Sequence, residues 1–143
     1  LNEIDCPHDL CDRFTEADEP VLRIFNQTPK ISTYLYAFVA GPYLSVEYNG
    51  LDKANYVPMK LYARKSFMKF VDPEMFFQLT KSGMDYYADF FGVKYPFTKY
   101  DQLFVPEFNS GAMENVGCVT FNESYIQEGI RSHSQIRSSL ESR

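Results

Sequence analysis

The residues best suited to chemistry lie together in the C-terminal third of the chain. They form one continuous segment, whose members are Gly111, Ala112, Met113, Glu114 and Asn115. A carboxylate can bind a cationic amino group through a charge-assisted hydrogen bond, which is stronger than a neutral one. Glu114 fits this role. Taken without their neighbours, these five residues also fit a tight surface turn with a solvated Glu114.

The residues around Glu114 have types that suit contact with a peptide. Gly111 has no Cβ, so its backbone can come close to a ligand. The backbone groups of Gly111 and Ala112 can pair with an extended chain, as an edge strand does. Met113 offers an adaptable apolar wall. We expect Asn115 to fix the turn through its side-chain amide.

Two predicted strands must hold this segment in place. Residues 100–105 and 117–121 are apolar enough for strands, and residues 106–115 form a loop rich in Gly, Asn and Ser. Glu107 and Glu123 flank the loop, where they could line a cleft. Because charged side chains are seldom buried, we expect both carboxylates to be exposed.

Further strands are predicted upstream. Alternating apolar and polar residues indicate half-buried strands, and one continuous apolar run indicates a buried strand. The alternating segments are 21–25, 43–48 and 59–64, and the apolar run is 31–39. A second helix could start within residues 134–143.

One long helix is predicted between the strand at residues 59–64 and the strand at residues 100–105. It begins at Asp72, Pro73 and Glu74, which are a cap, a first-turn proline and a first-turn acid, and it ends at Gly92. The face expected to be buried repeats every 3.6 residues. It contains Phe76, Leu79, Thr80, Gly83, Met84, Tyr87, Phe90 and Phe91. Gly83 is expected to let another backbone approach closely.

Three blocks of the sequence resemble zinc aminopeptidases of the aminopeptidase N type. Residues 104–121 are similar to that family's exopeptidase loop and edge strand. Residues 28–35 are similar to its last large strand before the catalytic domain. Residues 86–100 are similar to its first catalytic-domain helix and the strand that follows. The resemblance spans roughly residues 21–126.

The resemblance implies a function for the parent protein. That protein would use zinc to remove N-terminal amino acids from peptides, and residues 111–115 would hold the substrate's α-amino end. The family binds zinc through an H-E-x-x-H helix and a distal Glu. Neither His8 nor His133 precedes a Glu, so we assign no metal ligand and no catalytic residue. The chain is expected to end before the zinc motif and to be inactive alone.

The resemblance also implies the fold and the domains. The class would be α+β, with residues 1–55 as the C-terminal part of an N-terminal β-domain. Residues 56–143 would open a thermolysin-like catalytic domain. An alternative to a piece of an enzyme is a truncated product that binds peptides without cleaving them, or that is inert.

The bulk properties limit the partners and the compartment. The net charge is −5 and the pI about 5.0, which argues against nucleic acid as a partner. No apolar run approaches the roughly 20 residues of a membrane span. We expect a monomer whose partners are peptides with a free N-terminus.

Cysteine usage favours a reducing compartment. There are three cysteines, an odd number without regular spacing, so reduced thiols in the cytoplasm are expected. Cys6, His8 and Cys11 are too few for a four-ligand metal site, and no fitting Cys pair follows. A missing N-terminus could carry a signal or an anchor.

Overall fold

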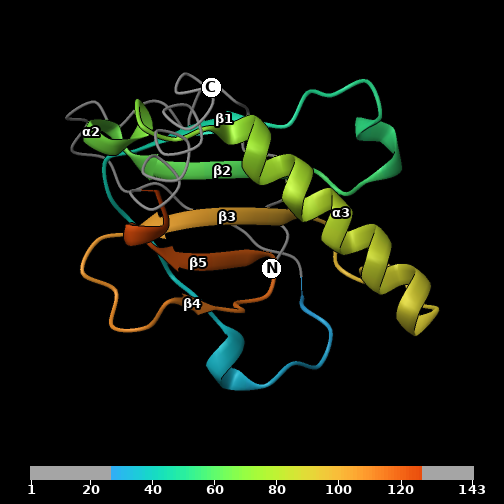
Figure 1. Ribbon diagram of the computed structural model, residues 1–143. Coiled ribbons are helices and arrows are strands. Elements are labelled where there is room, and N and C mark those ends of the chain that lie inside the picture. Colours follow the sequence, from blue (N-terminus) through green and yellow to red (C-terminus); the bar gives the residue numbers. More distant parts are fainter. Residues whose placement is uncertain (1–26, 127–143) are drawn as a thin grey trace, which may run out of the picture. The chain divides into compact units, whose positions relative to one another are not determined.

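The computed structural model describes residues 27–126 (Figure 1). By its internal contacts the chain divides into two units, Leu1–Thr33 and Tyr34–Arg143. The second unit contains a five-stranded sheet and one long helix, which confirms the α+β class. No helix among residues 27–126 has both the length and the apolar character to cross a membrane.

The sheet has the strand order β1-β2-β3-β5-β4. The pairs β2–β3 and β3–β5 are parallel, and the two outer pairs, β1–β2 and β4–β5, are antiparallel. Since parallel neighbours need a long crossover, a helix between β2 and β3 is expected on topological grounds. The strands are β1 Tyr43–Glu47, β2 Met59–Arg64, β3 Tyr100–Val105, β4 Ala112–Met113 and β5 Cys118–Asn122.

Strand β2 confirms the alternation predicted from the sequence. Met59, Leu61 and Ala63 are at most 1% exposed, while the residues between them are half-buried. The buried side chains form the core together with Phe77 and Phe104. One face of β2 is thus the centre of the packing.

The crossover is the helix α3, Pro73–Phe91, and both of its predicted ends are confirmed. The Asp72 carboxylate accepts a hydrogen bond from the Met75 backbone N–H at 3.2 Å, so it satisfies one of the free first-turn amides. Gly92 ends the helix in the left-handed region at φ 68°. The short helices are η1 Thr33–Leu35, η2 Lys53–Asn55 and α2 Lys65–Met68.

The predicted buried face of α3 is correct in part, since Phe76 and Met84 pack against the core. Phe76 packs edge-on against Phe104, with the ring centroids 5.0 Å apart. The buried residues are Phe77 and Lys81, while Leu79 is 69% exposed. The buried side of α3 therefore includes Phe77 and Lys81, which the predicted face did not contain.

The C-terminal turns of α3 are more exposed than predicted. Tyr87, Phe90 and Phe91 are 58%, 67% and 66% exposed, and the last turns of α3 run past the strands (Figure 1). Gly83 was expected to admit another backbone, but a Cβ placed on it would meet nothing within 4 Å. A pattern of period 3.6 locates an apolar stripe, but it does not say how far the covering sheet extends.

The strand predicted over residues 31–39 is wrong. The segment holds only the short helix η1, and Tyr34 and Phe38 are 62% and 84% exposed. A strand needs a neighbour for its backbone hydrogen bonds, and β1 already occupies the outer side of β2. An apolar run alone does not determine that pairing.

The sheet continues across residue 55, where a domain boundary is predicted. Strand β1 lies before that position and β2 after it, and Tyr43 pairs with Arg64 at one end of their ladder. The boundary and its assignment to two domains stay predictions. The predicted strand 21–25, the possible helix within 134–143, and Cys6, His8, Cys11 and His133 lie outside the described residues.

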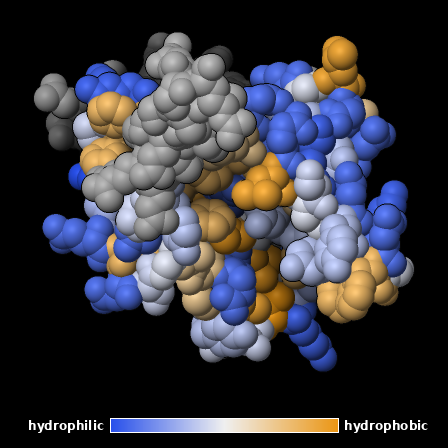
Figure 2. Space-filling model, in the orientation of Figure 1, coloured by the Kyte–Doolittle hydropathy of each residue, from blue (hydrophilic) through white to orange (hydrophobic). Residues whose placement is uncertain are grey.

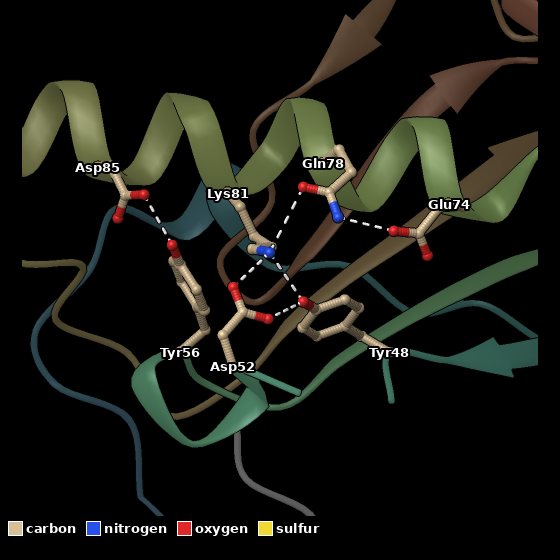
Figure 3. Close-up of polar contacts among 7 residues, drawn as sticks. All are labelled: Tyr48, Asp52, Tyr56, Glu74, Gln78, Lys81 and Asp85. Carbon is tan, nitrogen blue, oxygen red and sulfur yellow. Dashed lines mark hydrogen bonds and ion pairs between the residues drawn. The ribbon is translucent and has the colours of Figure 1, made fainter. Parts of the chain in front are cut away.

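A polar cluster joins α3 to the connection between β1 and β2 (Figure 3). Lys81 donates to the Tyr48 hydroxyl at 2.8 Å and forms an ion pair with Asp52 at 2.5 Å. Tyr48 also donates to Asp52. Hydrogen bonds from Lys81 and Tyr48 lower the pKa of Asp52, so its charged form is stabilised.

Candidate functional site

The segment 111–115 lies at an edge of the sheet. Its central residues form β4, which pairs antiparallel with β5 through Ala112–Phe121 and Met113–Thr120. Strand β4 is the last in the strand order, and within residues 27–126 no strand pairs with its outer side. An open edge of this kind can accept an extended peptide by adding a strand.

Asn122, at the end of β5, holds the loop that leads into β4. Its backbone N–H donates to the Gly111 carbonyl at 2.8 Å, and its side-chain amide donates to the Phe108 carbonyl at 2.6 Å. The Ser124 N–H donates back to the Asn122 side chain at 2.9 Å. Two hydrogen bonds from Asn122 therefore fix the approach to the segment, and the Ser124 N–H orients the Asn122 side chain.

Gly111 lies against the hydroxyl of Tyr125. A Cβ on Gly111 would be 2.7 Å from that oxygen, which is closer than atoms normally approach. Gly111 itself is exposed. Its lack of a side chain thus allows a close approach by the protein, in addition to the ligand contact expected from the sequence.

Asn115 fixes the other end of the segment. It is 6% exposed, accepts a hydrogen bond from the Thr120 hydroxyl at 3.0 Å, and donates to the Leu35 carbonyl at 3.4 Å. The Val116 N–H donates to the same carbonyl at 3.2 Å. The side-chain amide therefore ties the end of the segment to the Thr120 side chain and to the backbone at Leu35.

Three side chains of the segment differ in exposure. Ala112 and Glu114 are exposed, while Met113 is half-buried. The Glu114 carboxylate follows the edge strand directly, so a cation at the end of a peptide paired with β4 would lie in its neighbourhood. The arrangement can hold a positively charged amino group beside an extended backbone.

Glu123 is not exposed, contrary to expectation. It is 6% exposed and receives two hydrogen bonds from Arg64, at 2.7 Å from Nε and 2.5 Å from Nη2. Such a forked pair can make burial of the carboxylate tolerable. Glu107 is exposed, as predicted, and has a left-handed backbone with φ 50°.

The described residues do not supply a zinc site. Among residues 27–126 no three His, Cys, Asp or Glu side chains lie together as a metal ion requires. Both histidines of the sequence, His8 and His133, are outside that range.

Sequence reasoning missed three residues that support the loop: Arg64, Asn122 and Tyr125. Arg64 alternates with apolar residues, so it looked like part of a solvated face. Its partner Glu123 is 59 positions away, and a single sequence gives no signal for such a pair. Asn122 offered only the general tendency of Asn to bond nearby backbone.

Parts of the chain match proteins of known family. Residues 75–141 match the peptidase family M1 domain. The chain is 45% identical to aminopeptidase N of Streptomyces lividans and 36% identical to human aminopeptidase N. Each of these alignments covers 102 residues, which is 71% of the chain. It is also 36% identical over 104 residues, 73% of the chain, to the mitochondrial aminopeptidase 2 of Saccharomyces cerevisiae.

These relatives are much longer proteins. The chain spans 12% of the Streptomyces relative and 10% of the human and yeast ones. Identity of this level over the aligned part, together with the domain match, is far above chance. The chain therefore belongs to peptidase family M1, among proteins of the aminopeptidase N type.

Proposed function

We propose that this chain is the substrate-anchoring part of a zinc aminopeptidase that removes N-terminal amino acids from peptides. In this proposal the α-amino group of the peptide binds to Glu114, and the first residues of the peptide pair with β4. Relatives named aminopeptidase N, together with the match to family M1, support the general activity.

The observation that carries the proposal is the position of Glu114 at the sheet edge. Its carboxylate is exposed and follows a strand whose outer side is unpaired within residues 27–126. Asn115 and Asn122 fix the backbone on both sides of it. A fixed carboxylate next to an open edge selects a peptide by its charged terminus, since backbone pairing alone does not distinguish one end of a peptide from another.

Zinc enters the proposal through the family, whose members are generally zinc-dependent peptidases. Zinc supplies a Lewis acid and an activated water for peptide hydrolysis. Because residues 27–126 do not supply its ligands, the proposal assigns them to other parts of the protein. Within the described part, the proposed role is to bind the amino terminus and orient the peptide.

The decisive experiment replaces Glu114 by Ala in the longest natural protein that contains this chain. We expect KM for free peptides to rise about 10- to 100-fold, because a charge-assisted bond is lost. The preference for free over N-acetylated peptides should also disappear. Glu107→Gln is the matched control, since it removes another exposed carboxylate from the same loop and should leave both quantities unchanged.

Unchanged KM in Glu114→Ala, or a preference for free peptides that persists, would remove Glu114 from this role. If the longest natural protein has no H-E-x-x-H motif with a distal Glu, the alternative of a non-catalytic peptide-binding product gains support. Binding of free and N-acetylated peptides to the chain, measured by calorimetry, then tests the anchoring separately from hydrolysis.

A further inference from the structure

Residues 122–125, at the end of β5 and just after it, support the loop. Asn122 bonds the carbonyls of Phe108 and Gly111, and the Tyr125 hydroxyl lies against Gly111. The Glu123 N–H also donates to the Val105 carbonyl at 3.3 Å, where β3 ends. Residues 122–125 thus contact the loop at its entry and just before β4.

This support is itself held from another strand. Both carboxylate oxygens of Glu123 accept hydrogen bonds from Arg64, the last residue of β2. The side chain of Glu123 is only 8% exposed. Removing the guanidinium would leave a nearly buried carboxylate without its partner, which is far costlier than losing a surface pair.

A second contact, with the ring of Phe67, orients the Arg64 side chain. Its guanidinium carbon lies 4.8 Å above the ring centre of Phe67, a geometry that favours a planar cation. A planar fork matches both oxygens of a carboxylate at once, whereas the single ammonium of Lys does not. The pair therefore sets a direction as well as a distance between the end of β2 and residue 123.

We propose that Arg64 is a positioning residue for Glu114, acting through its forked pair with Glu123 and the loop contacts of Asn122. This inference rests on the proposed function, because it gives a reason for holding Glu114 still. Arg64 is not placed against the substrate. It acts on the geometry of the segment that binds the amino terminus.

A double-mutant cycle in the longest natural protein tests the proposal. Arg64→Gln should raise KM for free peptides about tenfold when Glu114 is present. In the Glu114→Ala background it should raise KM by less than about twofold, since the group it positions is gone. Arg64→Lys should lie between the wild type and Arg64→Gln, because it keeps the charge but loses the fork.

Lys81→Gln is the matched control. It breaks an ion pair whose lysine is about as buried as Glu123, but the pair joins α3 to the β1–β2 connection and not to the loop. It should lower stability with no change in KM. If Arg64→Gln folds poorly, the double variant Arg64→Gln with Glu123→Gln replaces both charges by amides that can still form a hydrogen bond. Its KM should lie between that of Arg64→Gln and that of the wild type.

Hydrogen exchange gives a readout that does not need activity. The Asn122 amide, bonded to the Gly111 carbonyl, should exchange at least about tenfold faster in Arg64→Gln than in the wild type, and at the wild-type rate in Lys81→Gln. The positioning role would be overturned if Arg64→Gln raised KM by the same factor with and without Glu114. It would also be overturned if the exchange rate of the Asn122 amide did not change in Arg64→Gln. An inactive wild type would overturn the proposed function instead, while the exchange result would still decide the role of Arg64.

Discussion

At the scale of single residues, Gly50 and Gly111 lie against tyrosine hydroxyls, and within residues 27–126 hydrogen bonds hold the hydroxyl beside Gly50. The Tyr48 oxygen, 2.1 Å from a Cβ placed on Gly50, is bonded by Lys81 and Asp52. We therefore expect Gly50→Ala to cost about 2–3 kcal/mol, as overpacking against fixed atoms does. Urea unfolding at constant m-value measures this cost.

Gly111→Ala should cost less, about 1 kcal/mol, although it meets an oxygen at 2.7 Å. Tyr125 is 43% exposed, so its ring can turn away. Tyr125→Phe removes the oxygen and leaves the next atom at 3.6 Å, so Gly111→Ala should cost almost nothing in that background. A cost that persists there would mean that the loop backbone, and not the hydroxyl, excludes a side chain.

The contributions of Asp101 and Asp52 to stability should change in opposite directions as pH rises. Burial raises the pKa of Asp101 above its ordinary value of 3.8, although Lys99 opposes the shift. Folding then favours the protonated form, so Asp101 lowers stability as pH rises through the window from 3.8 to its folded value. The stability of Asp101→Asn relative to the wild type should therefore increase as pH rises from below 3.8 through this window.

Asp52 provides the opposite case, because its hydrogen bonds with Lys81 and Tyr48 lower its pKa below 3.8. It stabilises the fold above pH 3.8, and this contribution is lost as pH falls through its lowered value. Asp52→Asn should therefore cost stability at neutral pH and progressively less in acid. Unfolding curves of both variants across pH check the signs, and parallel curves would contradict them.

At the scale of elements, the sequence indicated best what local chemistry decides. The cap at Asp72 and the stop at Gly92 follow from hydrogen bonding and backbone sterics within a few residues. Residues 31–39 and the exposed end of α3 were misjudged, because pairing and coverage depend on distant parts of the chain. The role of the loop stays a prediction, which depends on the family resemblance, and the Arg64–Glu123 pair could not be predicted because its members are 59 positions apart.

Gly83 within α3 and Gly92 just after its last residue test two local effects separately, helix propensity and backbone sterics. Gly83 is inside the helix with open space around it, so Gly83→Ala should stabilise the protein by about 0.5–1 kcal/mol through helix propensity. Gly92 also has open space, but its φ is 68°, so Gly92→Ala should cost about 1 kcal/mol. Guanidinium unfolding measures both, and a loss in Gly83→Ala would show that another backbone does approach there.

At the scale of the whole molecule, the sheet order explains how the site is built. Strands β2, β3 and β5 run parallel, so the ends of β2, β3 and β5 meet at one side of the sheet. Arg64, Val105 and Asn122 are the last residues of those strands. The loop, its support and the Arg64 pair are therefore neighbours because of topology, which explains why residues far apart in sequence act on one segment.

The last turns of α3 carry an aromatic patch, formed by Tyr86, Tyr87, Phe90 and Phe91. Each is at least 58% exposed, and the pairs Tyr86–Phe90 and Tyr87–Phe91 are stacked with centroids 6.0 and 5.9 Å apart. Apolar side chains are visible on the surface at this end of the helix (Figure 2). A contiguous exposed patch favours association, whereas single exposed apolar residues do not.

The monomer expected from the sequence refers to the parent protein, and we expect the isolated 143-residue chain to self-associate through this patch. The double variant Phe90→Gln with Phe91→Gln should shift its sedimentation towards the monomer and keep the helical circular dichroism signal, because these side chains add little to the core. Leu79→Gln is the control: Leu79 is 69% exposed on the same helix but outside the patch, so its replacement should leave association unchanged. Equal association of the wild type and the double variant would assign the contact to another surface, with the open edge of β4 next to be tested.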